Sequence, residues 1–216
     1  GSFVVDCLAR MLEWAEAFDT VELCDIGGGI GSLIENDEEL DTLEHLAETL
    51  VKRMQQFTGK TNRTLTLAIE PGCYLVGDAG YLVSTVNALT NDGIHEYAGL
   101  DTGINHFGHT HPDQKLRQVF KTARLDLPPR PYVLAGNLNE ERDVFFRAGD
   151  ANTPVELPAL TTGDLLVFSG VGTYAFSLAS PYCGRLLPAE VLVDDGRDRL
   201  VRGRQNFEDL SRNQTY

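Results

Sequence analysis

The stretch VELCDIGGG, residues 21–29, constrains the fold more than any other part of the chain. A short apolar strand runs directly into three consecutive glycines, Gly27, Gly28 and Gly29. Because glycine has no side chain to block the approach, the backbone N–H groups of such a loop can close around a phosphate. Glycine clusters also serve tight turns, so the run alone is weak evidence for a binding site.

A second predicted strand, LTLAI at residues 65–69, ends in Glu70, Pro71 and Gly72. A carboxylate at the end of a neighbouring strand can meet a positively charged ring on the ligand whose phosphate the glycines hold. The two strand ends together predict a phosphorylated cofactor with a basic ring nitrogen, and pyridoxal phosphate fits that description. We interpret Glu70 as functional, because a carboxylate buried at a strand end needs a partner.

The first part of the chain has the rhythm of a parallel α/β unit, helix–strand–helix–strand. Apolar residues recur at helical spacing before the glycine strand and again between the two strands, where Thr58-Gly59 is expected to end the helix. The apolar positions are Val4, Leu8, Met11, Leu12, Ala15, Phe18, Leu43, Leu46, Leu50, Met54 and Phe57. Two strands and two helices cannot close a sheet with helices on both faces, so this part must pair with further chain or pack on another subunit.

The pattern changes after Pro71 to short apolar runs broken by Gly, Pro, Asn and Asp. Strands are predicted at residues 81–86, 94–100, 132–135, 144–147, 165–168 and 189–194. Asp195-Gly196 is a typical hairpin turn. These elements predict an antiparallel β domain over residues 81–216, preceded by the α/β part over residues 1–80.

Composition limits the class of partner. The net charge of −14 and the pI of about 4.7 argue against nucleic acid and against an anionic membrane surface. No apolar run approaches the ~20 residues of a membrane span, and no leader pattern opens the chain, so we expect a cytoplasmic protein. The four cysteines (Cys7, Cys24, Cys73 and Cys183) are far apart and lack metal-like spacing, which favours reduced thiols.

Six short motifs occur in a fixed order along the chain. They are DIGGG at 25–29, EPG at 70–72, LDTG at 100–103, GDLLVF at 163–168, GTY at 172–174 and PAEVLV at 188–193. In this order they resemble the fold type III pyridoxal-phosphate decarboxylases, the group of diaminopimelate, ornithine and arginine decarboxylases. The resemblance covers about residues 1–210. It implies α/β plus β architecture: the last strands of an alanine-racemase-like (βα)8 barrel, then a C-terminal antiparallel β domain, with the chain end returning to the barrel.

The resemblance also implies roles for particular residues in a homodimer, or in a protein completed by a missing N-terminal barrel segment. Backbone around the three glycines and Gly72 would hold the cofactor phosphate, and Tyr174 would donate its hydroxyl to it. Glu70 would pair with the pyridine nitrogen. Asp101 and His109 would contact the amino-acid substrate. Asn139 and Asp143 would reach the partner subunit's active site as catalytic residues.

Four departures from the family pattern qualify these roles. Cys73 follows EPG where the family has arginine, and Cys183 stands where an asparagine is usual. Asn139 occupies the position of the catalytic cysteine, and an amide cannot act as a thiol acid. The family's Schiff-base lysine belongs to an earlier barrel strand, so we expect this chain to contain no such lysine and to be incomplete alone.

Simpler interpretations stand beside several of these roles. His106, His109 and His111 fall within six residues, but their spacing favours loop histidines or substrate contacts over a metal site. Asp101 could instead cap a turn with Thr102-Gly103, and Tyr174 could be ordinary core. A racemase on the same barrel plan fits the late motifs less well.

We therefore predict pyridoxal-phosphate-dependent decarboxylation of an amino or diamino acid. This chain would supply the phosphate cradle and the β domain. The alternative is a non-catalytic relative that binds and regulates a decarboxylase subunit, which Asn139 and the missing lysine favour and the intact glycine run and Glu70 disfavour.

Overall fold

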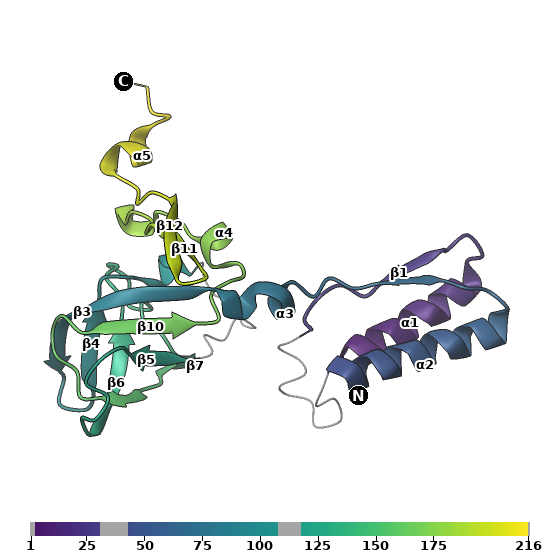
Figure 1. Ribbon diagram of the computed structural model, residues 1–216, viewed down its shortest axis with the longest axis horizontal. Helices are drawn as coiled ribbons and strands as arrows, with labels where there is room; N and C mark the ends of the chain where they lie inside the picture. The colour runs from purple at the N-terminus through teal and green to yellow at the C-terminus, as the bar shows by residue number, and fades with distance from the viewer. Residues whose placement is uncertain (1–2, 31–42, 108–117, 216) are drawn as a thin grey trace. The chain divides into compact units, whose positions relative to one another are not determined.

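The structure is a computed structural model that describes residues 3–30, 43–107 and 118–215. The chain forms two compact units, Gly1–Asp78 and Ala79–Tyr216, here unit 1 and unit 2 (Figure 1). Each unit has its own buried apolar core. The boundary falls in the short 3-10 turn η2 (Gly77–Ala79), two residues before the boundary expected from the sequence.

Unit 1 contains a two-stranded parallel sheet with two long helices packed against it. Strand β1 (Leu23–Asp25) pairs with β2 (Thr66–Ala68), with Leu23 opposite Thr66. Helix α1 (Phe3–Ala17) precedes β1, and α2 (Leu43–Thr61) precedes β2. The predicted order helix–strand–helix–strand is confirmed, and the short helix α3 (Gly72–Val76) follows β2.

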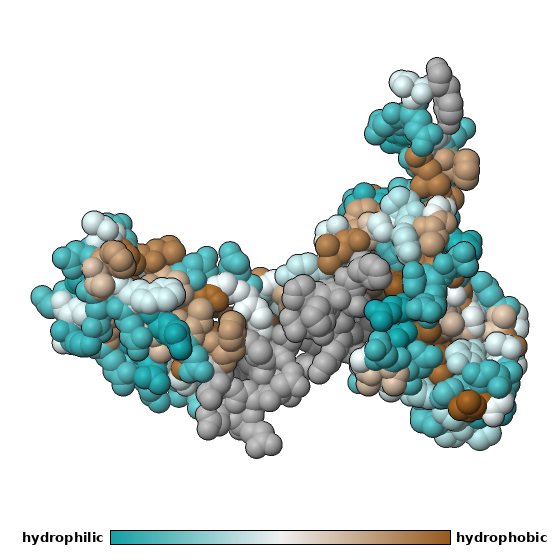
Figure 2. All heavy atoms as spheres, turned by 180° about the vertical axis from the view of Figure 1, so that it is seen from behind, coloured by the Kyte–Doolittle hydropathy of each residue, from teal (hydrophilic) through white to brown (hydrophobic). Residues whose placement is uncertain are grey.

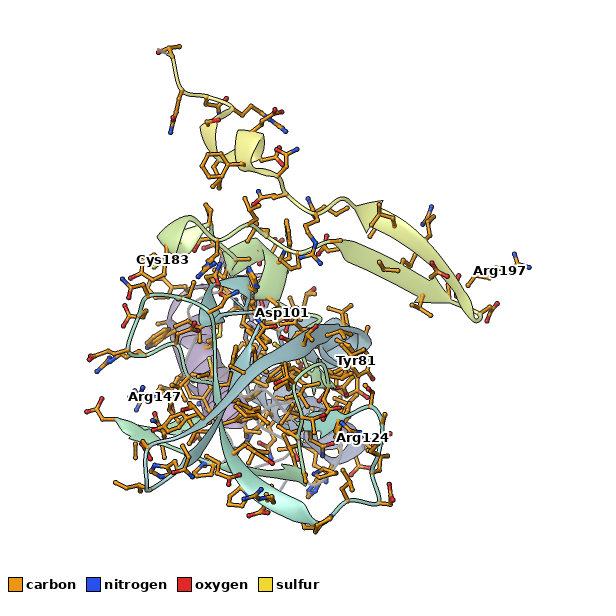
Figure 3. All side chains as sticks on the ribbon, turned by 90° about the vertical axis from the view of Figure 1, so that its left-hand side faces the viewer. Tyr81, Asp101, Arg124, Arg147, Cys183 and Arg197 are labelled. Atoms are coloured by element: carbon orange, nitrogen blue, oxygen red, sulfur yellow. The ribbon has the colours of Figure 1, made fainter. Side chains whose placement is uncertain are left out.

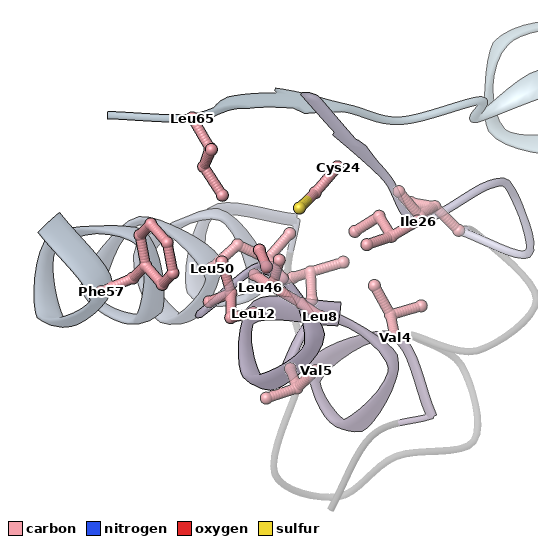
Figure 4. Packing of buried hydrophobic residues seen from close by; sticks show 12 residues of the cluster. Val4, Val5, Leu8, Leu12, Cys24, Ile26, Leu46, Leu50, Phe57 and Leu65 are labelled. Carbon is pink, nitrogen blue, oxygen red and sulfur yellow. The ribbon is translucent and has the colours of Figure 1, made fainter. Parts of the chain in front are cut away.

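The core of unit 1 forms because apolar residues recur on one face of each helix. Figure 4 shows the helix side chains meeting Cys24 and Leu65 from the strand layer. The buried helix residues are Val4, Val5, Leu8, Leu12, Ala15, Leu46, Leu50 and Phe57. Burial also raises the pKa of the Cys24 thiol, so this cysteine is a packing residue with little thiolate character.

Two details of the helices differ from the sequence expectation. Helix α2 continues past Gly59 to Thr61, and the left-handed residue at its end is Asn62, with φ 55°. The Asn62 N–H donates to the carbonyl of Thr58 at 2.9 Å, so asparagine supplies the left-handed cap expected of the glycine. Phe18 is 61% exposed, because α1 ends at Ala17 and Phe18 leaves the helical register.

Arg63 closes the C-terminal end of α1. Its guanidinium donates to the carbonyls of Ala15 at 2.7 Å, Phe18 at 3.1 Å, Asp19 at 3.2 Å and Val21 at 2.9 Å. The last carbonyls of a helix have no partner within the helix, and a planar five-donor side chain suits several of them at once. Arg63 therefore ties the connection before β2 to the end of α1.

Replacing Arg63 by methionine is expected to lower the free energy of unfolding of unit 1 by about 2–3 kcal/mol, because two partly buried carbonyls, those of Ala15 and Val21, lose a charged donor. Urea unfolding followed by the fluorescence of Trp14, the single tryptophan, measures this effect. Arg53→Met, at an exposed position on α2, is the matched control. Equal unfolding midpoints for the two variants would contradict the prediction.

Unit 2 contains a six-stranded sheet in the order β5-β10-β3-β4-β6-β9. Its strands are β3 (Tyr81–Asn91), β4 (Glu96–Leu100), β5 (Val119–Lys121), β6 (Pro129–Ala135), β9 (Val155–Pro158) and β10 (Leu165–Ser169). Four of the five pairs are antiparallel, but β4 and β6 are parallel, so the prediction of a purely antiparallel domain is wrong at this pair. The long connection between β4 and β6 allows it, since a parallel pair needs a crossover.

The remaining strands of unit 2 form two small hairpins. Residues 144–147, predicted as a strand, make only a bridge at Val144 and the first residue of β7 (Arg147–Ala148), which pairs with β8 (Ala151–Asn152). Strand β11 (Glu190–Asp194) pairs with β12 (Arg197–Arg202). Their turn is Asp195-Gly196, left-handed at both residues (φ 48° and 73°), so the predicted hairpin turn is confirmed.

Short helical elements complete unit 2. They are η3 (Ile104–His106), α4 (Ala175–Leu178), η4 (Tyr182–Gly184) and α5 (Phe207–Ser211). Figure 3 shows Arg197 at the tip of the β11–β12 hairpin, well away from the six-stranded sheet. Figure 2 shows apolar side chains exposed among polar ones toward the C-terminal end. Two exposed apolar residues are Val193 on β11, at 70%, and Phe207 on α5, at 78%. None of the described helices is long and apolar enough to cross a membrane.

A buried lysine joins the two edge strands of the sheet. Edge strands β5 and β9 lie in contact, so the sheet curls toward a barrel. Lys121 on β5 is 3% exposed, and its Nζ donates to the carbonyl of Ala159 at 2.7 Å. The same Nζ lies 3.1 Å from Asp164, which also pairs with Arg124. Burial opposes ionisation of Asp164, but the Thr161 amide, Arg124 and Lys121 outweigh it and lower its pKa to about 2.

The lowered pKa makes the stability of unit 2 depend on pH. A folded pKa of about 2 lies below the ordinary unfolded value of ~3.9. The stabilisation from Asp164 is therefore complete above pH ~4 and disappears as the pH falls toward ~2.

Asp164→Asn is expected to lower the free energy of unfolding by about 2–4 kcal/mol at neutral pH, with a smaller difference below pH ~4. Urea unfolding followed by circular dichroism at several pH values checks this, with the exposed Asp195→Asn as control; a pH-independent difference would contradict it.

Candidate functional site

The glycine loop follows β1 after a single residue, Ile26. Gly27 and Gly29 have left-handed φ angles of 70° and 84°, which a residue with a side chain rarely adopts. The Gly27 N–H donates to the Asp25 carboxylate at 2.9 Å and so fixes the first turn of the loop. The three glycines thus form a backbone-lined loop at the C-terminal end of a parallel strand, a common location for ligand sites.

The structure brings Glu70 and Gly72 to this same loop. The Glu70 N–H donates to the carbonyl of Gly27 at 2.7 Å, and the Gly72 N–H donates to the carbonyl of Glu70 at 2.8 Å. A Cβ added to Gly28 would lie 2.6 Å from the Glu70 carbonyl oxygen, so only glycine permits the approach. Glu70 is exposed, so the prediction that this carboxylate is buried at the strand end is wrong: β2 ends at Ala68, and the turn that follows carries the side chain to the surface. Four of the predicted cofactor-binding residues (Gly27, Gly28, Glu70 and Gly72) are therefore held together by the backbone.

Asp101 follows β4 in unit 2, where Figure 3 labels it beside the sheet. Its carboxylate accepts the Ser84 hydroxyl at 2.6 Å and the Thr85 N–H at 2.8 Å. Partial burial opposes ionisation, but these hydrogen bonds outweigh it and lower the pKa of Asp101. The predicted substrate contact is thus a carboxylate that stays ionised at neutral pH.

A loop over residues 136–143 carries Asn139 and is bound to the Asp101 segment. The Asn137 N–H donates to the carbonyl of Thr102 at 3.2 Å, and its side-chain Nδ2 donates to the carbonyl of Asp101 at 2.9 Å. Asn139 is exposed in this loop. Asp143 is buried, 3% exposed, and its carboxylate accepts the N–H groups of Ile104 and Leu138. The structure therefore joins the predicted Asp101, Asn139 and Asp143 in one part of unit 2.

Two residues near Asn139 belong to this cluster and were missed by the sequence analysis. The Tyr182 hydroxyl donates to the Glu140 carboxylate at 3.1 Å, which raises the pKa of Tyr182. No local pattern connects these residues, since they stand 42 positions apart. Glu140 immediately follows Asn139, so a second carboxylate flanks the predicted position of the catalytic group.

Tyr174 lies in the loop before α4. It has a left-handed φ of 59° and is 55% exposed, so it is not a core residue. The preceding loop packs closely on Gly80: the Val171 N–H donates to the Gly80 carbonyl at 3.2 Å, and a Cβ on Gly80 would overlap the backbone of Gly172. Tyr174 is therefore presented to solvent from a loop whose base is fixed.

His106 has a structural environment. Its Nε2 lies 3.0 Å from the Leu186 carbonyl oxygen, which can only accept, so Nδ1 accepts the Thr102 hydroxyl at 2.8 Å. Burial lowers the pKa of His106 and keeps the ring neutral. His109 and His111 lie outside the described residues. Within those residues, no three His, Cys, Asp or Glu side chains are grouped as metal ligands would be.

The predicted site residues divide between the two units. Gly27, Gly28, Gly29, Glu70 and Gly72 belong to unit 1, and Asp101, Asn139, Asp143 and Tyr174 belong to unit 2. Unit 1 supplies a backbone cradle beside a carboxylate, which suits a phosphorylated cofactor with a cationic ring. Unit 2 supplies ionised and polar groups that suit an amino-acid substrate.

Comparison with known proteins points to one family. Residues 3–172 match the family model described as "Pyridoxal-dependent decarboxylase, C-terminal sheet domain". The chain is 33% identical over 196 residues to a diaminopimelate decarboxylase of Methanothermobacter thermautotrophicus, covering 89% of this chain and 44% of that protein. It is 30% identical over 211 residues to the Escherichia coli diaminopimelate decarboxylase, covering 94% of this chain and 50% of that protein.

Solved structures show the same relationship. A crystal structure of diaminopimelate decarboxylase superimposes with a TM-score of 0.82 at 27% identity, covering 97% of this chain and 51% of that one. The arginine decarboxylase of Paramecium bursaria Chlorella virus shares the fold, with a TM-score of 0.64 at 20% identity over 83% of this chain and 49% of that one. The chain thus spans about half the length of the relatives it matches.

Proposed function

Because the chain belongs to the pyridoxal-dependent decarboxylase family, matched over residues 3–172, we propose that its protein decarboxylates an amino or diamino acid with pyridoxal phosphate as cofactor. One observation carries the proposal: the glycine loop after β1 is hydrogen-bonded to the Glu70 turn after β2, at 2.7 Å between the Glu70 nitrogen and the Gly27 oxygen. This junction supports the proposal because it joins a glycine loop and a carboxylate residue at the same end of two parallel strands.

The residues present fit the cofactor. The backbone around Gly27–Gly29 and Gly72 would line the phosphate, because glycines carry no side chain that could block it. The Gly27 and Gly72 N–H groups are bonded to Asp25 and to the Glu70 carbonyl, so these two glycines would shape the cradle by close approach. Glu70 would accept a hydrogen bond from the pyridine nitrogen and keep it protonated. Tyr174 would donate its exposed hydroxyl to the phosphate. When bound, the cofactor supplies an electron-accepting ring that stabilises the charge left on the α-carbon as carbon dioxide leaves.

The substrate side of the proposal rests on unit 2. The ionised carboxylate of Asp101 suits a second ammonium group on the substrate, and His109 is proposed as a further contact. Asn139 would orient the substrate, because an amide donates and accepts hydrogen bonds but does not replace a thiol acid. The relatives are named diaminopimelate decarboxylases. Since Cys73 and Asn139 depart from the family pattern, we propose an amino acid other than theirs.

The proposed assembly follows the resemblance. Unit 1 would be the last part of a (βα)8 barrel, and unit 2 the C-terminal β domain, in a homodimer whose subunits share active-site residues. The open two-stranded sheet of unit 1 supports this arrangement, because two parallel strands are marginal without neighbours. A cytoplasmic location remains a prediction.

The test uses the full-length protein expressed from its own coding frame. Bound pyridoxal phosphate is measured by its absorbance, and carbon dioxide release is measured with diaminopimelate, ornithine, arginine and lysine as substrates. The expected result is cofactor-dependent release from at least one amino acid. Asn139→Cys is expected to change the preferred substrate or the turnover rate. A protein that binds the cofactor but releases no carbon dioxide from any amino acid would contradict the proposal.

A second candidate function is a non-catalytic subunit that binds and regulates a decarboxylase. Asn139 favours it, because this position lacks the thiol acid. The same absorbance measurement separates the two functions. A regulator would carry no bound pyridoxal phosphate, even in the presence of its partner.

A further inference from the structure

Asp143 is held entirely by its own chain. Asp143 is only 3% exposed. Its Oδ1 accepts the Ile104 N–H at 2.8 Å, and its Oδ2 accepts the Leu138 N–H at 2.7 Å. Burying a carboxylate is costly unless its oxygens are hydrogen-bonded, and these two N–H groups provide the compensation. Each oxygen is thus committed to a backbone amide.

Glycines from two segments close around this carboxylate. A Cβ on Gly136 would overlap the carboxyl group of Asp143. A Cβ on Gly103 would lie 3.1 Å from Asp143 Oδ2 and 2.9 Å from Leu138 Cγ. The Gly136 N–H donates to the Asp143 carbonyl at 2.7 Å and closes the loop over residues 136–143. The carboxylate therefore fills the interior of the loop, where no larger residue at either glycine fits.

The loop anchored in this way carries Asn139 and lies against the Asp101 segment. Asp143 binds the amide of Ile104, three residues after Asp101, and the amide of Leu138, one residue before Asn139. Asn137 adds two hydrogen bonds to the carbonyls of Asp101 and Thr102. The Asp143 carboxylate and Asn137 therefore together fix the loop that carries Asn139 to the Asp101 segment.

We infer that Asp143 is a positioning residue, which acts by binding the loop that carries Asn139 to the segment after Asp101, rather than the catalytic residue that the family resemblance implies. The inference rests on the proposed function for its catalytic consequence. A catalytic group must touch substrate, and a buried carboxylate with both oxygens bound to its own backbone is not free to reach into a partner subunit.

The anchor itself is tested without activity, by amide hydrogen exchange of the full-length protein. In Asp143→Asn, protection of the Ile104 and Leu138 amides is expected to fall by about tenfold or more, because one acceptor oxygen becomes an amide donor. Asp150→Asn, at an exposed position nearby, is the matched control and should leave both amides protected. Unchanged protection in a folded Asp143→Asn chain would overturn the anchor.

A measurement on the wild-type chain guards against a variant that fails to fold. Scalar coupling across the two N–H···O bonds, between each amide nitrogen and the Asp143 carboxyl carbon, is observable by NMR when the bonds persist in solution. Detectable coupling at both Ile104 and Leu138 is the expected result. Absence of coupling at both amides would overturn the anchor regardless of any variant.

The catalytic consequence is tested by a double-mutant cycle in the full-length protein. Asp143→Asn and Asn139→Ala are each expected to lower kcat/KM. The kcat/KM of the double variant should be no more than about twofold below that of the less active single variant, because both changes remove the same interaction. The plot of kcat/KM against pH for Asp143→Asn should keep the acidic and basic limbs that the wild type shows. Multiplied effects of the two substitutions on kcat/KM, or loss of a limb of the pH profile, would show that Asp143 acts on the substrate directly and would overturn the inference.

No turnover by the wild type would overturn the proposed function and the catalytic consequence with it, whereas the amide measurements still decide the anchor.

Discussion

Replacing Glu70 by glutamine in the full-length protein is expected to slow amino-acid decarboxylation by about 100-fold or more while pyridoxal phosphate stays bound. Glutamine has nearly the size of glutamate but carries no charge, so it does not favour the protonated pyridine ring. The bonds that join this turn to the glycine loop are made by the backbone of Glu70, at 2.7 Å to Gly27 and 2.8 Å from Gly72. The phosphate cradle is therefore expected to survive the change.

Carbon dioxide release at saturating substrate and the absorbance of bound cofactor measure these two effects separately. Glu22→Gln is the matched control, because Glu22 is an exposed carboxylate just before β1 in the same unit. The control should keep the wild-type rate. A Glu70→Gln protein with full activity would remove Glu70 from its proposed role, and one without bound cofactor would show that its side chain serves binding instead.

Gly28→Ala is expected to weaken pyridoxal-phosphate binding by about 100-fold and to destabilise unit 1 by about 1–3 kcal/mol. The added Cβ would lie 2.6 Å from the Glu70 carbonyl oxygen, a backbone atom that cannot rotate away. The glycine loop and the Glu70 turn must then separate. Because the proposed phosphate and ring contacts come from opposite sides of this junction, both would lose their alignment.

Cofactor titration followed by absorbance, together with urea unfolding followed by Trp14 fluorescence, measures the two losses. Gly59→Ala introduces the same methyl group into α2, where no atom lies within 4 Å of the new Cβ. That control is expected to stabilise the helix by up to ~1 kcal/mol and to leave cofactor binding unchanged. Wild-type affinity in Gly28→Ala would mean that the junction does not form the cofactor site.

The unit 1 site could be predicted from sequence because its signals are local. Each strand of three residues is followed, after one isoleucine, by the turn predicted to bind the cofactor, Gly27–Gly29 after β1 and Glu70 after β2. Strands separated by one helix are normally parallel neighbours, so their C-terminal ends meet. The structure adds the hydrogen bond between Glu70 and Gly27, which no pattern specifies.

The sequence-based predictions of strands and of a helix end were wrong mainly where strand pairing depends on segments far apart in the chain. The parallel pair of β4 and β6 was missed because strand direction within a sheet is set by the path of the connection, not by the residues of either strand. The expected strand at 144–147 begins beside Asp143, whose carboxylate binds the Leu138 N–H inside the preceding loop, and within this range Val144 makes a bridge and Arg147 starts β7. The end of α2 shifted from Gly59 to Asn62 because asparagine also adopts the left-handed conformation.

By itself, the sequence determined the two amphipathic helices of unit 1, the strands that carry the glycine loop and Glu70, and the family, because periodicity and short motifs act over a few residues. Only the tertiary structure decided which polar groups are buried and what they bind. The Asp143 carboxylate accepts the Ile104 N–H across 39 positions of the sequence, and Lys121 donates to the Ala159 carbonyl across 38. The physical reason is that a buried charge is stable only where the completed fold supplies its hydrogen-bond partners, and those partners come from segments that folding alone brings together.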